Sequence, residues 1–152
     1  MARASVELLY AEEAGGKTHY FQEAAASSAN DWYAGDLVKL DSNGELVIAT
    51  AGAILGIACK AASGTASTEI PVIVLDSTMT CVAKHTTSAT NENMACDVHD
   101  FTFTAGAHTL ATGGTTDVAI LDNHPDDAWG TSGGKMLVRF LDAGLQMGGG
   151  HR

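Results

Sequence analysis

Short runs of apolar and β-branched residues, bounded by Gly, Asn, Asp, Ser or Pro, recur along most of this chain. From residue 35 onward these runs occupy residues 37–41, 45–49, 53–59, 70–75, 79–83, 101–104, 118–121 and 136–141. Runs of this length and spacing are typical of strands in a β-sandwich or β-barrel, whereas helix-length amphipathic stretches are scarce. We therefore predict a mainly β fold, a single small β-barrel or β-sandwich, with little helix.

Two local patterns refine this prediction. Residues 41–44, Asp-Ser-Asn-Gly, place turn formers between two of the runs, which predicts a β-hairpin. In the last run, residues 136–141, apolar side chains fall on both faces of the predicted strand. Such a strand is expected at the centre of a sheet or at a contact between subunits.

The chain has 152 residues, the size of one domain, and 45% hydrophobic residues against 17% charged ones suffice for a folded core. Residues 1–30 show no sustained hydrophobic period, and we interpret them as an extended N-terminal arm. Residues 31–144 form the predicted β domain. Residues 145–152 include three consecutive glycines and are expected to form a flexible C-terminal tail.

The charge balance argues against some partners. Asp and Glu outnumber Lys and Arg by 18 to 8, giving a net charge of −10 without a basic cluster, so nucleic acid is not an expected partner. The longest apolar stretch, residues 50–59, is much shorter than the ~20 residues that a membrane span requires. Glu7 interrupts any secretory core, so we expect no signal peptide, no membrane contact and synthesis in a cytoplasm.

The spacing of the cysteines and histidines is the most specific chemical pattern in the sequence. Cys81-x3-His85 is followed by Cys96-x2-His99, and two Cys with two His can bind zinc. On strands, residues 81 and 85 share a face but 96 and 99 do not, so the second pair converges only in a turn. Buried thiols and loop histidines explain the same residues. We predict no metal and no cofactor, and expect the three cysteines, which include Cys59, to be reduced and mostly buried.

Two further segments are weaker candidates for chemistry. Residues 122–127, Asp-Asn-His-Pro-Asp-Asp, could hold a hard cation or act as acid and base, but the same residues form turns. Residues 130–135 look like part of a phosphate-binding loop, except that Trp129 replaces its first glycine and Met136 its Ser or Thr. The letters of residues 130–134, Gly-Thr-Ser-Gly-Gly, fit the G-x-S-x-G motif of hydrolases, but a strand pattern follows them where that motif requires a helix. We predict that it is not an enzyme.

Large aromatic and apolar residues outside the strand cores are candidates for protein contacts. Trp32 and Tyr33 precede the predicted hairpin and Trp129 lies in a late loop, and such rings are enriched among interface anchors. The alternative is that these rings cap the ends of the barrel or sandwich. The arm could pair with the exposed sheet edge of a neighbour. Its candidate contact residues are Leu8, Leu9 and Tyr10.

The order of the segments forms a wider pattern. Residues 34–40 carry Gly-Asp before a hydrophobic strand, the hairpin follows, and residues 53–58 carry Ile-Leu-Gly before another strand. Later segments continue the pattern at residues 70–78, 119–121, 125–128 and 135–140. Across roughly residues 32–142, this order and spacing resembles that of tailed-bacteriophage capsid decoration proteins, also called cement or head-stabilising proteins.

The resemblance implies a domain of β-tulip-like form that binds the outer surface of an assembled, expanded capsid and stabilises it. It implies the major capsid protein as a partner, contacts among neighbouring copies as homotrimers or through arms, and a location on the outer surface of the virion. One alternative is another virion component, such as a head fibre base, a minor tail component or a receptor-binding module. A second is a cupin-like metal-binding barrel that uses His85, His99, His108 or His124.

Overall fold

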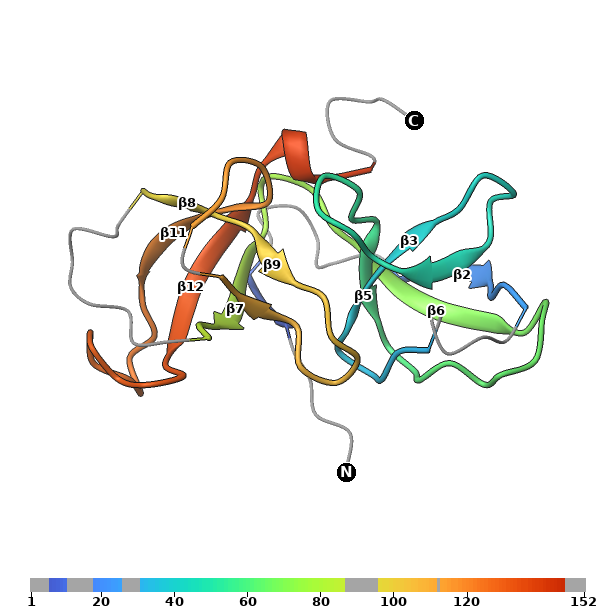
Figure 1. Cartoon of the computed structure of the whole chain (residues 1–152), viewed down its shortest axis with the longest axis horizontal. Coiled ribbons are helices and arrows are strands. Elements are labelled where there is room, and N and C mark those ends of the chain that lie inside the picture. Colours follow the sequence, from blue (N-terminus) through green and yellow to red (C-terminus); the bar gives the residue numbers. More distant parts are fainter. Residues whose placement is uncertain (1–5, 11–17, 26–30, 87–95, 112, 147–152) are drawn as a thin grey trace.

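The computed structural model describes residues 6–10, 18–25, 31–86, 96–111 and 113–146, except for the side chains of residues 7–10 (Figure 1). The described chain is mainly β, as predicted. Its strands are β1 (Val6–Tyr10), β2 (Thr18–Gln22), β3 (Leu37–Leu40), β4 (Leu46–Ile48), β5 (Gly56–Ala58), β6 (Glu69–Val74), β7 (Thr80–Lys84), β8 (Val98–His99), β9 (Phe101–Thr102), β10 (Thr109–Leu110), β11 (Val118–Asn123) and β12 (Lys135–Phe140). The helix in this part of the chain is one short 3-10 turn, Asp142–Gly144.

The strands form two five-stranded sheets and a two-stranded ribbon. We call β1-β7-β12-β11-β8 the first sheet, on the left in Figure 1, and β2-β6-β5-β3-β4 the second sheet, on the right. All of their strand pairs are antiparallel. The ribbon of β9 and β10 lies between them in this view. Antiparallel pairing allows one face of each sheet to be buried and the other to meet solvent.

A core shared by the two sheets joins them. Val138 and Phe140 of β12 are fully buried, and they belong to the same apolar cluster as Leu37 and Ile57 of the second sheet. The rings of Phe101 and Phe140 stack with their centroids 5.8 Å apart. β12 is the middle strand of its sheet, which confirms the central position predicted from its two apolar faces.

A second core belongs to the second sheet alone. It contains Val38, Leu46, Leu55, Ile70 and Val72, and Trp32 completes it. The chain after β2 reaches the opposite edge of the same sheet, where Ala24 donates its backbone N–H to the carbonyl of Leu46 in β4 at 3.1 Å. The second sheet is therefore strongly curled around its own apolar side chains.

The predicted runs correspond closely to β3–β7, β9, β11 and β12, and the hairpin forms between β3 and β4. Its turn closes with Gly44 at φ +77°, a conformation that glycine adopts without strain. The predicted N-terminal arm differs in its described parts, because β1 pairs with β7 and β2 with β6 of the same chain. These pairings attach the segment to the two sheets.

The described start of the predicted tail is also attached to the β domain. Leu145 is buried in the shared core. The Gln146 side chain accepts a hydrogen bond from the Leu40 N–H at 2.8 Å and donates one to the Leu40 carbonyl at 2.7 Å. The amide thus takes the place of a neighbouring strand beside β3. Residues 147–152 lie outside the described residues.

Candidate functional site

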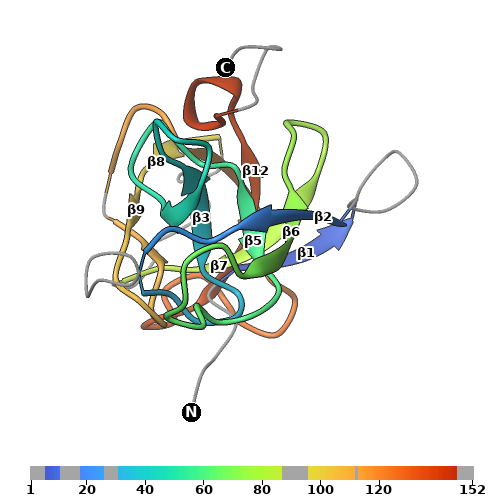
Figure 2. The same ribbon diagram turned by 90° about the vertical axis from the view of Figure 1, so that its right-hand side faces the viewer.

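The outer strand of the second sheet is its most open element. β2 pairs with β6 from Thr18 opposite Ile73 to Gln22 opposite Glu69. On its other side, Glu23, directly after the strand, forms an isolated parallel bridge with Leu46 of β4. Four of its five side chains are exposed, and Tyr20 is 65% exposed. Figure 2 turns this sheet toward the viewer, with β2 running across it. An open edge strand is a site at which another chain can add a strand.

Pro71 shows which backbone groups of β2 face outward. Its carbonyl accepts a hydrogen bond from the N–H of Cys59, directly after β5, at 2.9 Å, so Pro71 directs its backbone toward β5. These directions alternate along an antiparallel ladder, and Tyr20, which is opposite Pro71, therefore directs its N–H and C=O away from β6. Thr18 and Gln22 have the same orientation. Thr18 and Tyr20 thus direct a donor and an acceptor each to the outer edge, whereas Gln22 lies beside the bridge that joins Glu23 to Leu46 of β4.

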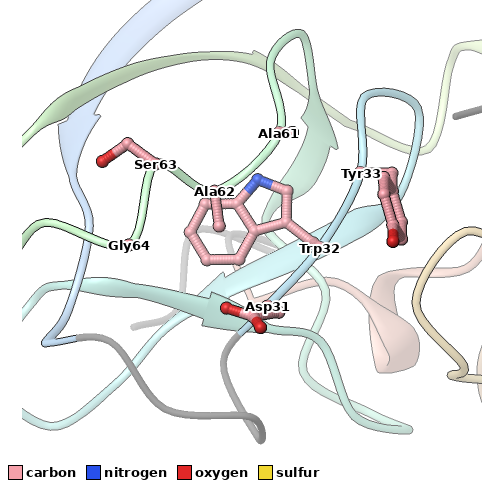
Figure 3. Close-up of a pocket in the computed structure, with 7 residues that line it drawn as sticks. All are labelled: Asp31, Trp32, Tyr33, Ala61, Ala62, Ser63 and Gly64. Atoms are coloured by element: carbon pink, nitrogen blue, oxygen red, sulfur yellow. The ribbon is translucent and has the colours of Figure 1, made fainter.

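A shallow pocket of about 310 Å³ lies beside the predicted contact residues Trp32 and Tyr33 (Figure 3). Trp32 is 2% exposed, and its Nε1 donates to the Lys60 carbonyl at 2.9 Å, so the indole packs as a core side chain. This geometry fits the alternative in which the ring caps the end of the sheet. Tyr33 is 46% exposed and remains available for contacts. The other residues that line the pocket are Asp31, Ala61, Ala62, Ser63 and Gly64.

The remaining predicted contact residues are spread over the first sheet. Trp129 is half-buried and packs against the shared core. Leu8, Leu9 and Tyr10 are in β1, an edge strand of the first sheet, and their side chains lie outside the described residues. Among the predicted contact residues whose side chains are described, Trp32 and Trp129 pack against different cores, and Tyr33 is the exposed one.

Of the four residues in the predicted zinc pattern, the structure places the two histidines side by side. The rings of His85 and His99 lie edge to face with centroids 5.3 Å apart, and both are buried. Burial, with a smaller effect of Asp76, raises the pKa of the Cys81 thiol to about 12, so this group stays protonated. Among the described residues, no group of three His, Cys, Asp or Glu side chains is placed to hold a metal ion.

The expectation that most cysteines are buried is wrong. Cys59 and Cys96 are exposed, and only Cys81 is buried. Cys59 follows the end of β5, and Cys96 lies in a turn before β8 with φ +72°. Strand ends and turns are exposed positions, whereas Cys81 lies inside β7 and faces the shared core. All three thiols are free.

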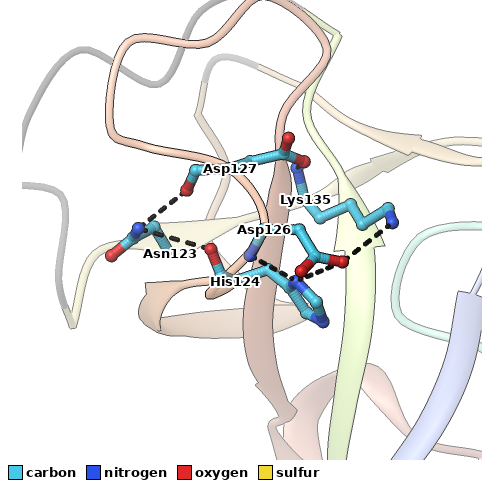
Figure 4. Close-up of polar contacts among 5 residues, drawn as sticks. All are labelled: Asn123, His124, Asp126, Asp127 and Lys135. Carbon is cyan, nitrogen blue, oxygen red and sulfur yellow. Dashed lines mark hydrogen bonds and ion pairs between the residues drawn. The ribbon is translucent and has the colours of Figure 1, made fainter.

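The polar groups of the acidic loop after β11 form hydrogen bonds and ion pairs mainly with one another (Figure 4). Asn123 donates from its Nδ2 to the Asp127 carbonyl at 2.7 Å, and His124 Nδ1 accepts from the Asp126 N–H at 3.1 Å. Lys135 Nζ lies 3.8 Å from an Asp126 carboxylate oxygen. These contacts are those of a hydrogen-bonded turn, the interpretation that the Asn, Pro and Asp residues favour.

A buried polar pair joins the β9–β10 ribbon segment to the second sheet. His108 Nδ1 accepts a hydrogen bond from the Leu37 N–H at 3.0 Å, and its Nε2 lies 3.9 Å from Asp36 Oδ2. Both side chains are fully buried. Burial lowers the pKa of His108, and the nearby Asp36 carboxylate opposes this effect only in part. A neutral imidazole with its proton on Nε2 has a lone pair on Nδ1, and this lone pair accepts the hydrogen bond from the Leu37 N–H.

Two neighbouring carboxylates have opposite environments. Burial favours the neutral form of Asp100, but hydrogen bonds from the N–H groups of Thr115, Thr116 and Asp117 and from the Thr116 hydroxyl outweigh it and lower its pKa. Burial raises the pKa of Asp117 despite its bonds from Phe101 and Gly52. Both groups hold loops in place, which is a structural role.

Sequence reasoning missed β2 as a strand and the buried polar groups. Thr18, Tyr20 and Phe21 are residue types that favour strands, but the segment is too short for a clear period. His108 and Glu23 carry no sequence signal of burial. Glu23 is 2% exposed, and its carboxylate accepts bonds from Ser63 and Gly64 across the fold.

Comparisons with models of known protein families, with curated proteins and with solved structures gave no match. In the described part of the chain, no helix is long and apolar enough to cross a membrane.

Proposed function

We propose that this chain is a structural virion protein that binds the outer surface of an assembled phage capsid and stabilises it. The observation that carries this proposal is the outer edge of β2 at Thr18 and Tyr20, where an exposed tyrosine and outward backbone donors and acceptors offer a place for another protein. The resemblance of residues 32–142 to capsid decoration proteins supplies the identity of the partner, the major capsid protein.

The location of the polar and charged groups supports a binding role. Two clusters of polar side chains could serve chemistry. The His85–His99 pair is buried, and the polar groups of the loop at residues 122–127 hydrogen-bond within the loop. By contrast, Tyr20 in β2 and Tyr33, before β3, are large exposed side chains. Tyrosine contributes contact area and a hydroxyl at protein interfaces.

Stabilisation would follow from linkage and from multiple contacts. A protein that binds only the assembled shell shifts the equilibrium toward that shell by mass action. Each copy needs only a modest contact, because contacts among copies raise the effective concentration of their neighbours. The chain would act without a chemical step, and neither cofactor nor catalytic residue is required.

The test is co-sedimentation of the purified chain with expanded capsids that lack it, with the bound copies counted for each major capsid subunit. Binding that saturates at a simple ratio to the capsid lattice is the expected result. Unexpanded capsids serve as the comparison for dependence on the assembled, expanded state. No saturable binding to either form would contradict the proposal and would favour a tail or fibre component.

A further inference from the structure

The turn between β3 and β4 contains the one asparagine in the sequence that is followed by glycine, Asn43. The β3–β4 hairpin projects from the second sheet (Figure 1). Asn43 and Gly44 are both exposed, and a Cβ atom added at Gly44 would meet nothing within 4 Å. The peptide group that joins the two residues is therefore accessible to solvent and has open space beside it.

An Asn–Gly pair can react with itself. The backbone nitrogen after an asparagine can attack the side-chain carbon Cγ and close a five-membered ring, but the side chain of the following residue usually obstructs this attack. Glycine has no side chain, and its backbone adopts conformations that other residues avoid. Gly44, with φ +77°, therefore leaves the path to the Asn43 carboxamide free of a Cβ atom.

We propose that Asn43 is a site of spontaneous covalent modification, at which the Gly44 nitrogen displaces ammonia from the Asn43 carboxamide and water then generates a carboxylate. Hydroxide from the solvent takes the proton of the Gly44 nitrogen, the bond from this nitrogen to Cγ forms, and the Cγ–Nδ2 bond breaks as ammonia leaves with a proton from water. Water then adds to either carbonyl of the cyclic imide and opens it to aspartate or isoaspartate. Neither step is an oxidation or a reduction.

The hydrogen bonds of the turn control the first step. The Gly44 N–H donates to the Asp41 carbonyl at 3.0 Å, and Asp41 Oδ1 accepts the N–H groups of Asn43 at 2.8 Å and of Glu45 at 3.0 Å. A backbone N–H that donates to a carbonyl is harder to deprotonate, because the resulting anion would face the carbonyl oxygen. The reaction therefore requires local opening of the turn, and exposed loop tips are among the segments that open most readily.

Asn123, the other asparagine in the described part of the chain, is a natural control within the same molecule. It is followed by His124, whose side chain obstructs the attack. Its Nδ2 also donates to the carbonyls of His124 at 3.4 Å and Asp127 at 2.7 Å, which hold the carboxamide in place. No other described residue hydrogen-bonds the Asn43 carboxamide, so its orientation is not fixed in this way.

The modification changes the charge and the geometry of the hairpin. It adds a carboxylate beside those of Asp41 and Glu45, in a chain whose net charge is already −10. An isoaspartate also inserts one extra carbon atom into the main chain directly before Gly44, inside the turn that sets Leu40 opposite Leu46. The inference does not depend on the proposed function, since it concerns a reaction of the isolated chain.

Peptide mapping of the folded, full-length chain after incubation at mildly alkaline pH tests the proposal. Mass spectrometry should find a carboxylate in place of the amide at Asn43, as a mixture of aspartate and isoaspartate, while Asn123 stays intact. Gly44→Ala places a Cβ atom in the path of the attack and should slow the conversion about tenfold or more.

Two substitutions of Asp41 test the control by the turn. Asp41→Ala removes the acceptor of two backbone hydrogen bonds and should speed the conversion about tenfold or more. Asp41→Asn retains a side-chain oxygen that accepts both bonds and should react as slowly as the wild type. Circular dichroism spectra that match the wild-type spectrum would show that the variants fold.

Several outcomes would overturn the inference. An Asn43 that survives in the folded chain after it has converted in urea-unfolded chain would show that the turn never opens enough to react. Equal rates at Asn43 and Asn123, or an unchanged rate in Gly44→Ala, would rule out Gly44 as the attacking group. Formation of aspartate without isoaspartate would rule out the cyclic imide, and an unchanged rate in Asp41→Ala would rule out the control by the turn.

Discussion

Gly56 occupies a position in β5 where no other residue fits. A Cβ atom added there would lie 2.1 Å from the Ile73 carbonyl oxygen and 2.8 Å from Val72 Cγ1. The first distance is more than 1 Å shorter than an ordinary contact, and the atom it meets is backbone in β6, which cannot rotate away. We therefore predict that Gly56→Ala forces β5 from β6 and strongly destabilises the second sheet.

The size of the effect follows from the pairing. β5 and β6 are joined at three residue pairs, and both flank the core around Trp32. Overpacking in a core costs ~1–3 kcal/mol, and each backbone hydrogen bond lost adds ~1 kcal/mol. We expect Gly56→Ala to lower the free energy of unfolding by about 3 kcal/mol or more, a large part of the stability of a domain this size.

Two other glycines are matched controls. Gly44 has open space around it but a φ of +77°, so Gly44→Ala should cost only about 1 kcal/mol. Gly113 has open space and no unusual φ, so Gly113→Ala should change stability by less than about 0.5 kcal/mol. Urea unfolding followed by tryptophan fluorescence measures all three. If Gly56→Ala costs no more than Gly44→Ala, the close approach of β5 and β6 is wrong.

Three further predictions concern polar groups. Burial lowers the pKa of His108 in the folded state, so the unfolded chain binds its proton more readily and stability should fall as pH drops below about 6.5. His108→Gln should flatten this dependence in urea titrations, and an unchanged slope would refute the assignment. Cys81, with its pKa near 12, should react with iodoacetamide at pH 8 only after unfolding, whereas the two exposed cysteines react in the native state, as mass spectrometry of the labelled peptides would reveal. Gln146→Ala removes both bonds to Leu40 and should cost about 1–3 kcal/mol, while a loss below 0.5 kcal/mol would show that the tail segment is not attached there.

Local sequence patterns predicted much of the fold because antiparallel strands and tight turns are specified by nearby residues. The hairpin at residues 41–44 and the strand at residues 136–141 are examples, since turn chemistry and hydrophobic alternation act over a few residues. The N-terminal segment was less predictable. β1 and β2 pair with strands more than 45 residues later in the chain, and no local pattern encodes such distant partners.

The candidate site shows the same division. The aromatic residues 32 and 33 were recognised together, but only the packing of the second core decides that Trp32 is buried and Tyr33 exposed. Likewise, the sequence placed His85 and His99 in a pattern compatible with zinc, whereas the fold buries the two rings together without a third ligand among the described residues. Burial depends on which surfaces meet, and that is a property of the whole chain.

The sequence by itself determined the mainly β character, the acidic surface and the positions of most strands from residue 37 onward, because composition and short-range alternation are local quantities. Only the tertiary structure decided that β2 is the outer strand of the second sheet and directs the backbone of Thr18, Tyr20 and Gln22 away from β6. That direction depends on Pro71, more than 45 residues away, whose backbone bond to Cys59 sets the alternation of the whole ladder.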